Sequence, residues 1–427
     1  MSSGRTSSRP LHVDSERLRA DFETLSTFGA TSGGGVSRPC FSEAHLAARE
    51  WFLERAVAAG LDTRVDAAGN HSALLHPSRP PDAPTLLLGS HLDSVPDGGR
   101  FDGALGVVAA LEVLRTIREA GLELPTALEA IDFTDEEGTL VGLLGSRALA
   151  GTLTPELLRK PRGGREALVA GLRRAGLAER RLGEARRDPA SLAGYLELHV
   201  EQGPQLERMG VDIGIVTGIV GSRSFSVLLR GQTAHAGTTP MDARADAGIG
   251  AAELMLAVRE IVVRDFPSSV ATVGDVRLEP GVFNVVPGSA RLAIEFRSAE
   301  SDELDELESA ILSCAKGVAE SLALDVEVSP VGAWQPTPLD PAVRAAVRRA
   351  ADTLGLSAVE LPSRAGHDAQ ALAALTPSGM IFVSALGGIS HAPEESTRWE
   401  DCVKGADVLL GAAVELAVGA MAAAAEA

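Results

Sequence analysis

The sequence predicts an α/β protein whose mainly parallel sheet is covered by helices, with a smaller α+β domain inserted into it. The first observation is an alternation. Residues 85–89 and 127–133 are short apolar runs typical of buried strands, and residues 106–120 between them have helical spacing. Strand–helix–strand units form parallel sheets, and ligands gather beyond the carboxyl ends of their strands. A surface helix is expected over 42–59 and another central strand over 378–383.

The second observation is that the order of predicted strands and helices changes after Gly221. We expect strands and helices there in the order β-α-β-β-α-β, which is that of a ferredoxin-like unit, over residues 224–229, 243–263, 270–278, 290–296, 303–322 and 324–331. We therefore predict an inserted domain of residues 220–329 and a larger domain of residues 1–219 and 330–427. Residues 151–190, rich in Arg and Leu, are expected to add helices over one face.

The composition bounds the class of protein. A chain of 427 residues is long enough for two or three domains, and its 45% hydrophobic and 23% charged content is ordinary for a soluble globular enzyme. The net charge of -19 argues against nucleic acid or an anionic membrane surface as partner, because both would repel the protein. A small molecule is the expected ligand.

The sequence favours a cytoplasmic location. Residues 1–10 are rich in Ser and Arg but lack the apolar core of a signal peptide, and no run of 18 uncharged apolar residues follows. Residues 405–427 come closest, but Asp407 and Glu415 favour a packed terminal helix. The three cysteines contain no Cys-x-x-Cys pair and are too few for a disulfide framework, which fits a reducing compartment.

Five short segments carry a His or a carboxylate where predicted strands give way to turns. The candidate metal ligands are His91, Asp102, Glu137, His199 and His391. Imidazole and carboxylate without thiolate favour zinc, manganese, cobalt or nickel, and the residue types do not decide among these. Two neighbouring divalent cations supply a hydroxide and a Lewis acid, which hydrolysis of an amide-type bond at neutral pH requires.

The residue types suggest a division of roles. Asp102 precedes a glycine that permits a tight turn, and its carboxylate can offer one oxygen to each of two cations about 3.5 to 4 Å apart. Glu136 and Glu137 are adjacent, so their side chains diverge: one ligates a metal while the other accepts a proton from water. Asp93 lies close after a candidate ligand, and it either orients that imidazole or braces the catalytic acid.

Each of these residues has an ordinary structural interpretation by itself. A single His at a strand end is usually a surface or structural residue, and the acidic run 135–137 alone would more often be a solvated turn. The whole set of residues is a more specific signal of a metal site than any one of them. Three of the nine histidines, together with three carboxylates, all fall at predicted strand ends or in the turns after them.

Longer motifs carry a resemblance to a known family. The chain resembles the amidase branch of the dinuclear aminoacylase/carboxypeptidase metallohydrolases in Gly-Ser-His-Leu-Asp-Ser-Val, Phe-Asp-Gly, Asp-Glu-Glu-Gly, Glu-Leu-His-Val-Glu-Gln-Gly-Pro, Ala-His-Ala-Gly-Thr-Thr-Pro-Met, Phe-Asn-Val-Val-Pro-Gly and Gly-Gly-Ile-Ser-His-Ala-Pro-Glu-Glu. That branch contains N-carbamoyl-L-amino-acid hydrolase, β-ureidopropionase and allantoate amidohydrolase. The similarity runs from about Ser42 to Glu395, and peptidase relatives usually place a carboxylate where His199 stands.

The resemblance implies a role for each candidate in the larger domain, which would be a metal-dependent exopeptidase-like catalytic domain. His91 and His199 would hold one metal ion, Glu137 and His391 would hold the other, and Asp102 would bridge them. Glu136 would be the general base. Asp93 is counted with it as a catalytic candidate because of its position two residues after His91.

The resemblance also implies that the inserted domain is a lid and dimerisation domain of a homodimer. Its His235 would reach the partner subunit's active site and stabilise the oxyanion, and Gln202, Asn284 and Arg297 would contact the substrate. The residues themselves allow plainer interpretations. The fork of Arg297 suits a carboxylate, but a surface salt bridge is equally common. Asn284 is as common in turns, Gln202 as a polar residue at a strand end, and His235 in a loop.

Two stretches need separate comment. Ser363-Arg-Ala-Gly-His-Asp368 resembles a family segment that often has Gly where Arg364 stands, so Arg364 is expected to alter the substrate pocket. We interpret His367 and Asp368 as active-site support rather than ligands. The glycine run 33–35 lacks the preceding strand of a phosphate loop and is expected to be a surface loop.

The expected reaction is hydrolysis of the carbamoyl C–N bond of an N-carbamoyl amino acid or related ureido acid, giving the free amine, carbon dioxide and ammonia. Alternatives within the family are an allantoate amidohydrolase and an aminoacylase or dipeptidase. From a different class, the chain would be a metal-binding or amino-acid-binding regulator that has lost catalysis. The presence of both glutamates and all five candidate ligands argues against that alternative.

Overall fold

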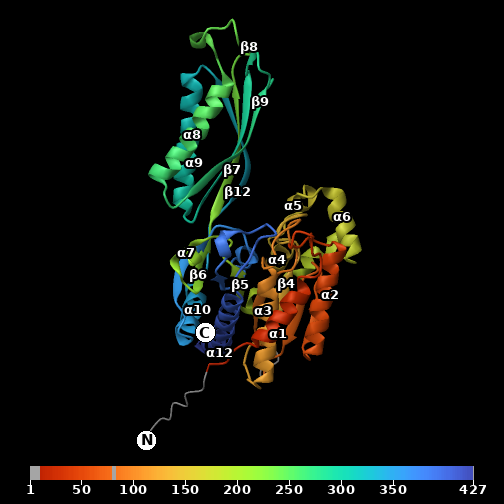
Figure 1. The fold of residues 1–427 in the computed structure, drawn as a ribbon. Coiled ribbons are helices and arrows are strands. Elements are labelled where there is room, and N and C mark those ends of the chain that lie inside the picture. Colours follow the sequence, from red (N-terminus) through yellow and green to blue (C-terminus); the bar gives the residue numbers. More distant parts are fainter. Residues whose placement is uncertain (1–9, 79–82, 427) are drawn as a thin grey trace. The chain divides into compact units, whose positions relative to one another are not determined.

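The computed structural model describes residues 10–78 and 83–426 (Figure 1). The chain divides into two compact units, which are described separately: a larger unit of residues 1–217 and 338–427, and a smaller unit of residues 218–337. Residues 1–9, on which the expectation of no signal peptide depends, lie outside the described residues.

The described part of the larger unit is built on a nine-stranded sheet. Its strand order is β1-β2-β4-β3-β5-β15-β6-β13, and β14 pairs with β6. The pairs β4/β3, β3/β5 and β5/β15 are parallel, whereas β1/β2, β2/β4 and β15/β6 are antiparallel. The strands are β1 (Asp62–Val65), β2 (His71–Leu75), β3 (Thr85–His91), β4 (Ala127–Phe133), β5 (Leu192–Val200), β6 (Ile213–Ile219), β13 (Thr337–Pro338), β14 (Ala358–Ser363) and β15 (Ser378–Val383).

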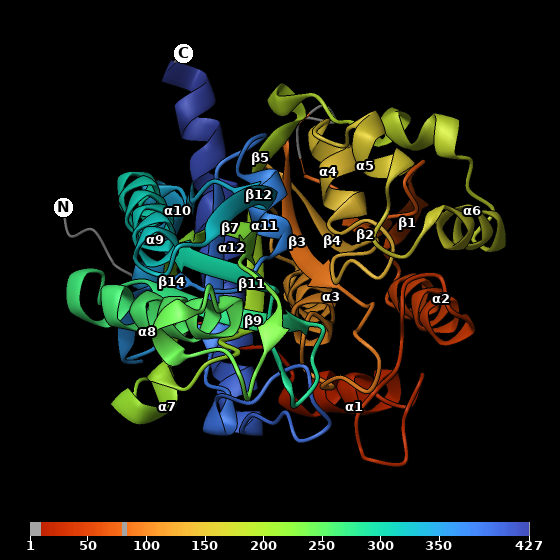
Figure 2. The same cartoon turned by 90° about the horizontal axis from the view of Figure 1, so that it is seen from above.

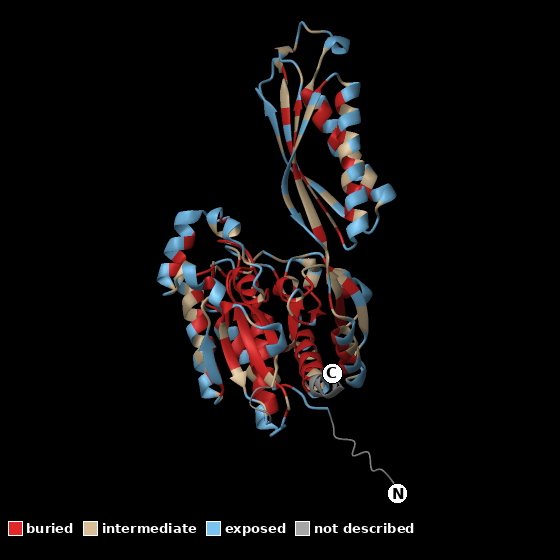
Figure 3. Ribbon diagram, turned by 180° about the vertical axis from the view of Figure 1, so that it is seen from behind, coloured by how far each residue is buried: buried red, intermediate tan, exposed pale blue. Residues whose placement is uncertain are grey.

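Helices flank this sheet and bury its central strands (Figures 2 and 3). Strands β3, β4 and β15 are buried over almost their whole length, as expected of parallel strands covered on both faces. Among the helices, α3 and α12 contact the sheet and each other. The helices are α1 (Ser15–Leu25), α2 (Glu43–Ala58), α3 (Ala104–Glu119), α4 (Leu144–Ala150), α5 (Pro155–Arg159), α6 (Arg165–Arg174), α7 (Gln205–Met209), α10 (Pro341–Thr353), α11 (Asp368–Leu372) and α12 (Trp399–Glu426).

The smaller unit is an antiparallel four-stranded sheet, in the order β12-β7-β11-β9, packed against two helices. Inward-facing residues alternate along β11, and they join the helices in one apolar core. A short pair, β8 with β10, lies beside this sheet. The elements are β7 (Gly221–Arg230), β8 (Ala234–His235), α8 (Ala247–Asp265), β9 (Val270–Glu279), β10 (Val285–Val286), β11 (Ser289–Ser298), α9 (Ser301–Ser321) and β12 (Asp325–Trp334).

The elements confirm the predicted α/β class and the order of strands and helices, with shifts at their ends. β3 extends two residues beyond the predicted Gly89, so that His91 ends the strand instead of following it. α8 begins at Ala247 instead of 243, because the Asp246 carboxylate caps the N–H groups of the first turn. Within the described residues, none of the helices combines the length and the apolar character needed to cross a bilayer.

Candidate metal centre

The carboxyl ends of the central parallel strands bring the candidate ligands to one edge of the sheet. His91 is the last residue of β3, and the acidic turn 135–137 follows β4. His199 lies near the end of β5, and His391 is in the loop after β15. These four strands are neighbours in the sheet, so segments separated by up to three hundred residues meet there.

Asp102, just before α3, lies at the centre of the group. Its Oδ1 is 3.1 Å from His199 Nε2 and 3.5 Å from His91 Nε2, while its Oδ2 is 3.2 Å from His391 Nε2. Glu137 Oε2 is 3.4 Å from the same His391 nitrogen. The five residues therefore form two ligand groups, His91–Asp102–His199 and Asp102–Glu137–His391, which share one carboxylate.

Backbone carbonyl groups fix the tautomers of the two buried histidines. Nδ1 of His91 lies 3.0 Å from the carbonyl of Asp93, and Nδ1 of His199 lies 2.8 Å from that of Val200. A neutral imidazole beside a carbonyl oxygen carries its proton on that nitrogen, so each Nε2 presents a lone pair toward Asp102. The Gly103 N–H donates to His199 Nε2 at 3.1 Å, which agrees with this assignment.

Gly103 itself is required by the closeness of these groups. It has φ of +64°, and a Cβ added there would overlap the imidazole ring of His91. Only glycine combines this conformation with so little volume. The Asp102–Gly103 turn can therefore deliver the carboxylate directly between the imidazoles.

Two further carboxylates hold the acidic turn in place. The carboxylate of Asp93 accepts the backbone N–H groups of Glu136 and Glu137, each at 3.2 Å. Asp135, with φ of +57°, accepts three successive N–H groups of residues 140–142. His91 Nδ1 is closer to the Asp93 carbonyl than to its carboxylate, which is 3.8 Å away. Of the two roles considered for the Asp93 side chain, the contacts favour bracing the acidic turn.

Burial and crowding of negative charge shift the pKa values in the site. Burial raises the pKa of Glu136 well above its ordinary value, and raises that of Glu137 to about 7 with the help of neighbouring Asp102. Burial opposes ionisation of Asp102 as well, but when the rings of His199, His391 and His91 are protonated, their hydrogen bonds to its carboxylate hold its pKa well below its ordinary range. The hydrogen bond to Asp102 raises the pKa of His391 to about 9.

A second layer of buried polar residues lies behind His199. The ring of His367 is 4.6 Å from that of His199, and its Nε2 is 2.8 Å from Ser363 Oγ. His367 also forms a third potential ligand group with Glu197 and His199. Glu197 accepts hydrogen bonds from Ser90 Oγ and the Ala369 N–H, so its oxygens already have partners. These contacts indicate that His367 and Glu197 hold His199 in position.

Gln202 and Glu395 complete the surroundings of Asp102. Gln202 Nε2 donates to Asp102 Oδ2 at 2.8 Å, and Gln202 Oε1 is buried without a hydrogen-bond partner among the described residues. Glu395 accepts the N–H groups of Phe101 and Asp102, and Ser390 Oγ donates to it. Glu395 is part of the motif Gly-Gly-Ile-Ser-His-Ala-Pro-Glu-Glu, but the sequence predicts no role for it. The only available signal was its position four residues after His391.

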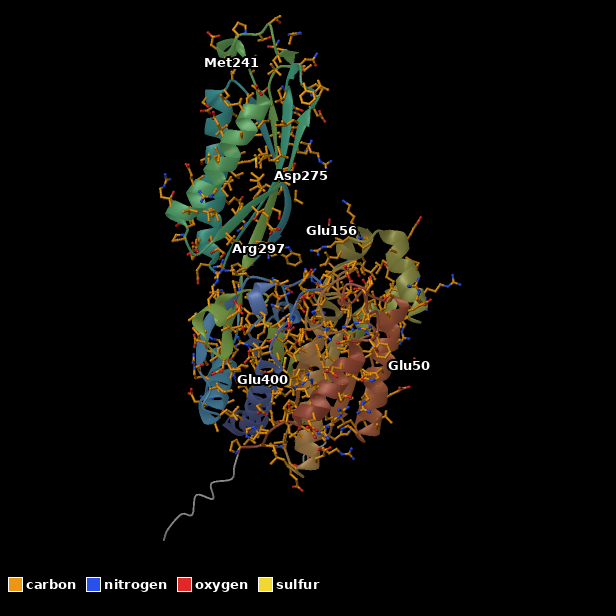
Figure 4. All side chains as sticks on the ribbon, in the orientation of Figure 1. Glu50, Glu156, Met241, Asp275, Arg297 and Glu400 are labelled. Atoms are coloured by element: carbon orange, nitrogen blue, oxygen red, sulfur yellow. The ribbon has the colours of Figure 1, made fainter. Side chains whose placement is uncertain are left out.

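The three remaining candidates lie in the smaller unit. His235 is exposed in β8, and the N–H of Gly237 donates to its Nδ1 at 3.0 Å. Asn284 is exposed beside β10, and its carbonyl accepts the Ala236 N–H. Arg297 pairs with Glu295 at 2.7 Å and lies at one end of the four-stranded sheet, whereas Met241, soon after His235, lies at the other (Figure 4).

The donor set fits divalent cations. Two ligand atoms each about 2.1 Å from one tetrahedral ion lie about 3.4 Å apart, and the nitrogen-to-oxygen distances around Asp102 run from 3.1 to 3.5 Å. The Nε2 lone pairs of His91 and His199 face a carboxylate oxygen, an arrangement that a cation between them stabilises. Imidazole and carboxylate ligands are those of zinc, manganese, cobalt and nickel sites.

The fold and this ligand cluster are those of a metal-dependent hydrolase. Residues 87–415 match the sequence model of the family described as Peptidase family M20/M25/M40. The chain belongs to this family.

Relatives and solved structures place the chain near the amidases of the family. It is 37% identical to an N-carbamoyl-L-amino acid amidohydrolase of Geobacillus stearothermophilus, over 95% of this chain and 100% of that protein. It is 32% identical to an allantoate amidohydrolase of Bacillus subtilis, over 88% and 91% of the two chains. A solved amidase of the hydantoinase/carbamoylase family from Burkholderia multivorans superposes with a TM-score of 0.88, at 35% identity, over 96% and 99% of the chains. The predicted resemblance to the amidase branch is confirmed.

Proposed function

We propose that this protein removes the carbamoyl group of N-carbamoyl-L-amino acids or closely related ureido acids at a two-metal site centred on Asp102. The observation that carries the proposal is the orientation of the Asp102 carboxylate, with one oxygen toward His91 and His199 and the other toward His391. A carboxylate placed in this way can serve two cations at once.

The residues for two cations are all present in the larger unit. His91 and His199 would hold one ion, Glu137 and His391 would hold the other, and Asp102 would bridge them. Bound zinc, manganese, cobalt or nickel would supply a Lewis acid and lower the pKa of bound water to about 7.

Glu136 is suited to move the proton. Its side chain is nearly buried, it lies 3.6 Å from His91, and its backbone is held by Asp93. We assign it as the base that accepts a proton from the attacking water and then donates it to the leaving nitrogen. The free amine leaves, and the carbamic acid formed with the water breaks down to carbon dioxide and ammonia.

The layout of the smaller unit supports a homodimer with shared active sites. Along β11, Ser289 pairs with Arg230 near His235, whereas Arg297 pairs with Ser222 at the opposite end. Eight residues of strand separate the two positions, which is about 26 Å. One small substrate cannot contact both ends of one such unit. We therefore propose that Arg297 of one subunit binds the substrate carboxylate, while the partner contributes His235 for the oxyanion and Asn284 for a second polar contact.

The names of the relatives support a ureido acid as substrate. The Geobacillus relative is named for N-carbamoyl-L-amino acids and the Bacillus relative for allantoate, both of which carry ureido groups. The higher identity to the former, over its whole length, favours an N-carbamoyl amino acid for this chain. The charge of -19 supports a small-molecule partner over nucleic acid. Three free cysteines support a reducing, cytoplasmic location.

A substrate panel tests the proposal. Purified protein is reconstituted with zinc, manganese, cobalt or nickel in turn, and is given N-carbamoyl-L-amino acids, allantoate, N-acetyl amino acids and dipeptides. We expect ammonia and free amine from the N-carbamoyl compounds at the highest kcat/KM. Faster cleavage of acetyl compounds or dipeptides would identify an aminoacylase or dipeptidase. Full metal occupancy without hydrolysis of any compound would identify a regulator.

A further inference from the structure

Residues 151–190 form a basic segment in an acidic chain. They include ten Lys and Arg residues against five Asp and Glu residues, a net charge of +5, whereas the whole chain has a net charge of -19. The helices α5 and α6 and the 3₁₀ helix η1 (Glu179–Ala185) belong to this segment, and η1 packs against α4 in the larger unit (Figure 2). The candidate metal ligands lie outside it, so the function proposed above does not account for its charge.

A pocket with a volume of about 690 Å³ lies among these elements. Four arginines line it: Arg159, Arg165, Arg180 and Arg186. Among the described residues of the lining, Glu179 alone is acidic, and its carboxylate is 2.7 Å from Nη2 of Arg165. Small-molecule sites have volumes of about 300 to 1,000 Å³. The pocket therefore has the size of such a site and a surplus of positive charge.

Three of the four guanidinium groups have no partner for their charge. The side chains of Arg159, Arg180 and Arg186 are exposed, and they make no hydrogen bond or ion pair with the residues that the structure describes. Other arginines of the segment differ, since Arg181 pairs with Glu184 and Arg187 with Glu129. Like charges gathered at one pocket repel each other, and a bound anion would offset this repulsion.

The backbone after α4 positions one of these arginines. Gly151, the residue that follows α4, has φ of +74°, and a Cβ added there would lie 2.8 Å from both Cδ and Nε of Arg186. Only glycine combines this conformation with so little volume. The side chain of Arg186 therefore packs against the backbone of Gly151, which also lines the pocket, and this limits where its guanidinium can lie.

The lining favours a ligand with several phosphate groups over one with a single carboxylate. A guanidinium stays charged and binds phosphate oxygens through two parallel hydrogen bonds. One carboxylate neutralises one of three unpaired charges, whereas two linked phosphates bring more negative charge and enough acceptor oxygens for three guanidinium groups. Leu153 and Leu158 also line the pocket and are partly exposed, so they offer carbon surface to the rest of the ligand.

We propose that this pocket is a second binding site, for a small molecule with two or more linked phosphate groups such as a nucleoside diphosphate. Arg159, Arg180 and Arg186 would hold the phosphates. The inference goes beyond the proposed function and does not depend on it, because none of the candidate metal ligands lines this pocket.

Calorimetry on the full, metal-loaded chain tests the inference with ADP, pyrophosphate, inorganic phosphate and adenosine as probes. We expect one ADP or one pyrophosphate to bind per chain, about tenfold or more tightly than inorganic phosphate, because more charge-assisted hydrogen bonds form. Adenosine alone should not bind. Tighter binding of ADP than of pyrophosphate would identify a nucleotide as the ligand, and equal binding would identify a polyphosphate; both results support the site.

Variants of the lining locate the bound probe. Arg180→Gln and Arg186→Gln should each weaken ADP binding about tenfold, as the loss of a charge-assisted hydrogen bond allows. Arg186→Lys keeps the charge without the planar fork and should retain part of the affinity. The matched control is Arg181→Gln, which removes the same charge from the next position of η1, where the side chain pairs with Glu184 and does not line the pocket. It should leave the affinity unchanged.

Three results would overturn the inference. One is the absence of binding by ADP and pyrophosphate. Another is an equal loss of affinity in Arg180→Gln and Arg181→Gln, which would indicate a general effect of charge. The third is unchanged ADP binding in the double variant Arg180→Gln/Arg186→Gln, which would place the probe elsewhere, the metal centre included. None of these results depends on hydrolysis of a ureido acid, which the substrate panel measures separately.

Discussion

Glu395 holds Asp102 by its backbone: Glu395 Oε1 accepts a 3.0 Å hydrogen bond from the Asp102 N–H, although 293 residues separate the two. The same oxygen accepts the N–H of Phe101, and Ser390 Oγ donates to the other. One buried carboxylate thus ties the turn that carries Asp102 to the loop that carries His391. We therefore expect metal binding at the candidate centre to depend on this tie as well as on the candidate ligands.

The first prediction concerns this positioning role. Glu395→Ala removes the acceptor of two backbone N–H groups and loosens both loops, so we expect metal affinity to fall about 10- to 100-fold, as for other residues that orient ligands. Titration of the apoprotein with zinc measures the affinity. Glu395→Gln retains an acceptor oxygen and should restore most of it. Equal losses in the two variants would show that the negative charge, rather than the hydrogen bonds to the loop, is what matters.

Some of the site was predictable from the sequence because its parts are local. A His or an acid at the end of an apolar run is visible in a few residues, and parallel strands bring such ends to one edge. Strands 127–133 and 378–383 were predicted with the bounds that β4 and β15 have. The α/β class of the chain, and the β-α-β-β-α-β order of the elements in its inserted segment, were predictable for the same reason. Both follow from the local spacing of apolar residues.

Other features were not predictable because they depend on packing between distant segments. Glu395 is one of two adjacent glutamates in its motif, and only the fold shows which of them turns toward Asp102. The two-residue strands β8 and β10 are too short for a periodic pattern. Asp93 was given two possible roles, and the choice depends on where the acidic turn lies relative to its carboxylate.

The second prediction is that Glu136→Gln separates metal binding from turnover. The amide keeps the size of the side chain but cannot accept a proton from water, so kcat should fall about 10²- to 10⁴-fold. Metal content, measured by mass spectrometry of the purified protein, should be unchanged, because Glu136 belongs to neither of the two ligand groups centred on Asp102. Residual activity above a tenth of wild type would refute the assignment.

The third prediction is that Asp102→Ala disrupts both ion sites at once. Its two oxygens face different ligand groups, so metal content should fall from two ions per chain to less than one, and activity should be lost with it. Asp275→Ala, an exposed aspartate of the smaller unit (Figure 4), serves as the control and should keep two ions. A variant at Asp102 that loses one ion and keeps the other fully bound would show that this carboxylate does not bridge.

The fourth prediction tests the shared active sites. His235→Ala and Arg297→Ala should each be nearly inactive as homodimers. In a hybrid dimer, one site receives both intact residues and the other receives neither, because the two positions lie at opposite ends of the smaller unit. Random mixing makes about half of the dimers hybrids, and each hybrid has one intact active site out of two. Activity should therefore recover to about a quarter of wild type. The measurement is activity after co-refolding or co-expression of the two variants.

The control for this experiment mixes each variant with itself, which should restore nothing. Sedimentation must also show dimers in the mixture. Absence of recovery in proven hybrids would place His235 and Arg297 in separate roles, and a purely monomeric protein would remove His235 from the mechanism.

The fifth prediction concerns the buried ion pair beneath the metal centre. Arg49 Nε is 2.7 Å from Asp132 Oδ2, and its other nitrogens donate to the carbonyls of Gly69 and Phe133. Asp132 in turn accepts the N–H of Leu92, the residue after His91. Arg49→Met leaves a buried carboxylate without its partner, which costs about 3 to 5 kcal/mol of unfolding free energy.

Urea denaturation of the apoprotein measures this cost without the contribution of bound metal. Arg19→Met, which breaks an exposed pair with Glu23, should change the free energy of unfolding by less than about 1 kcal/mol. The double variant Arg49→Met/Asp132→Leu removes both charges and should recover much of the loss, because no unpaired charge is left in the interior. If the double variant is as unstable as Arg49→Met alone, the hydrogen bonds of Arg49 to the ends of the strands, and not the ion pair, stabilise this region.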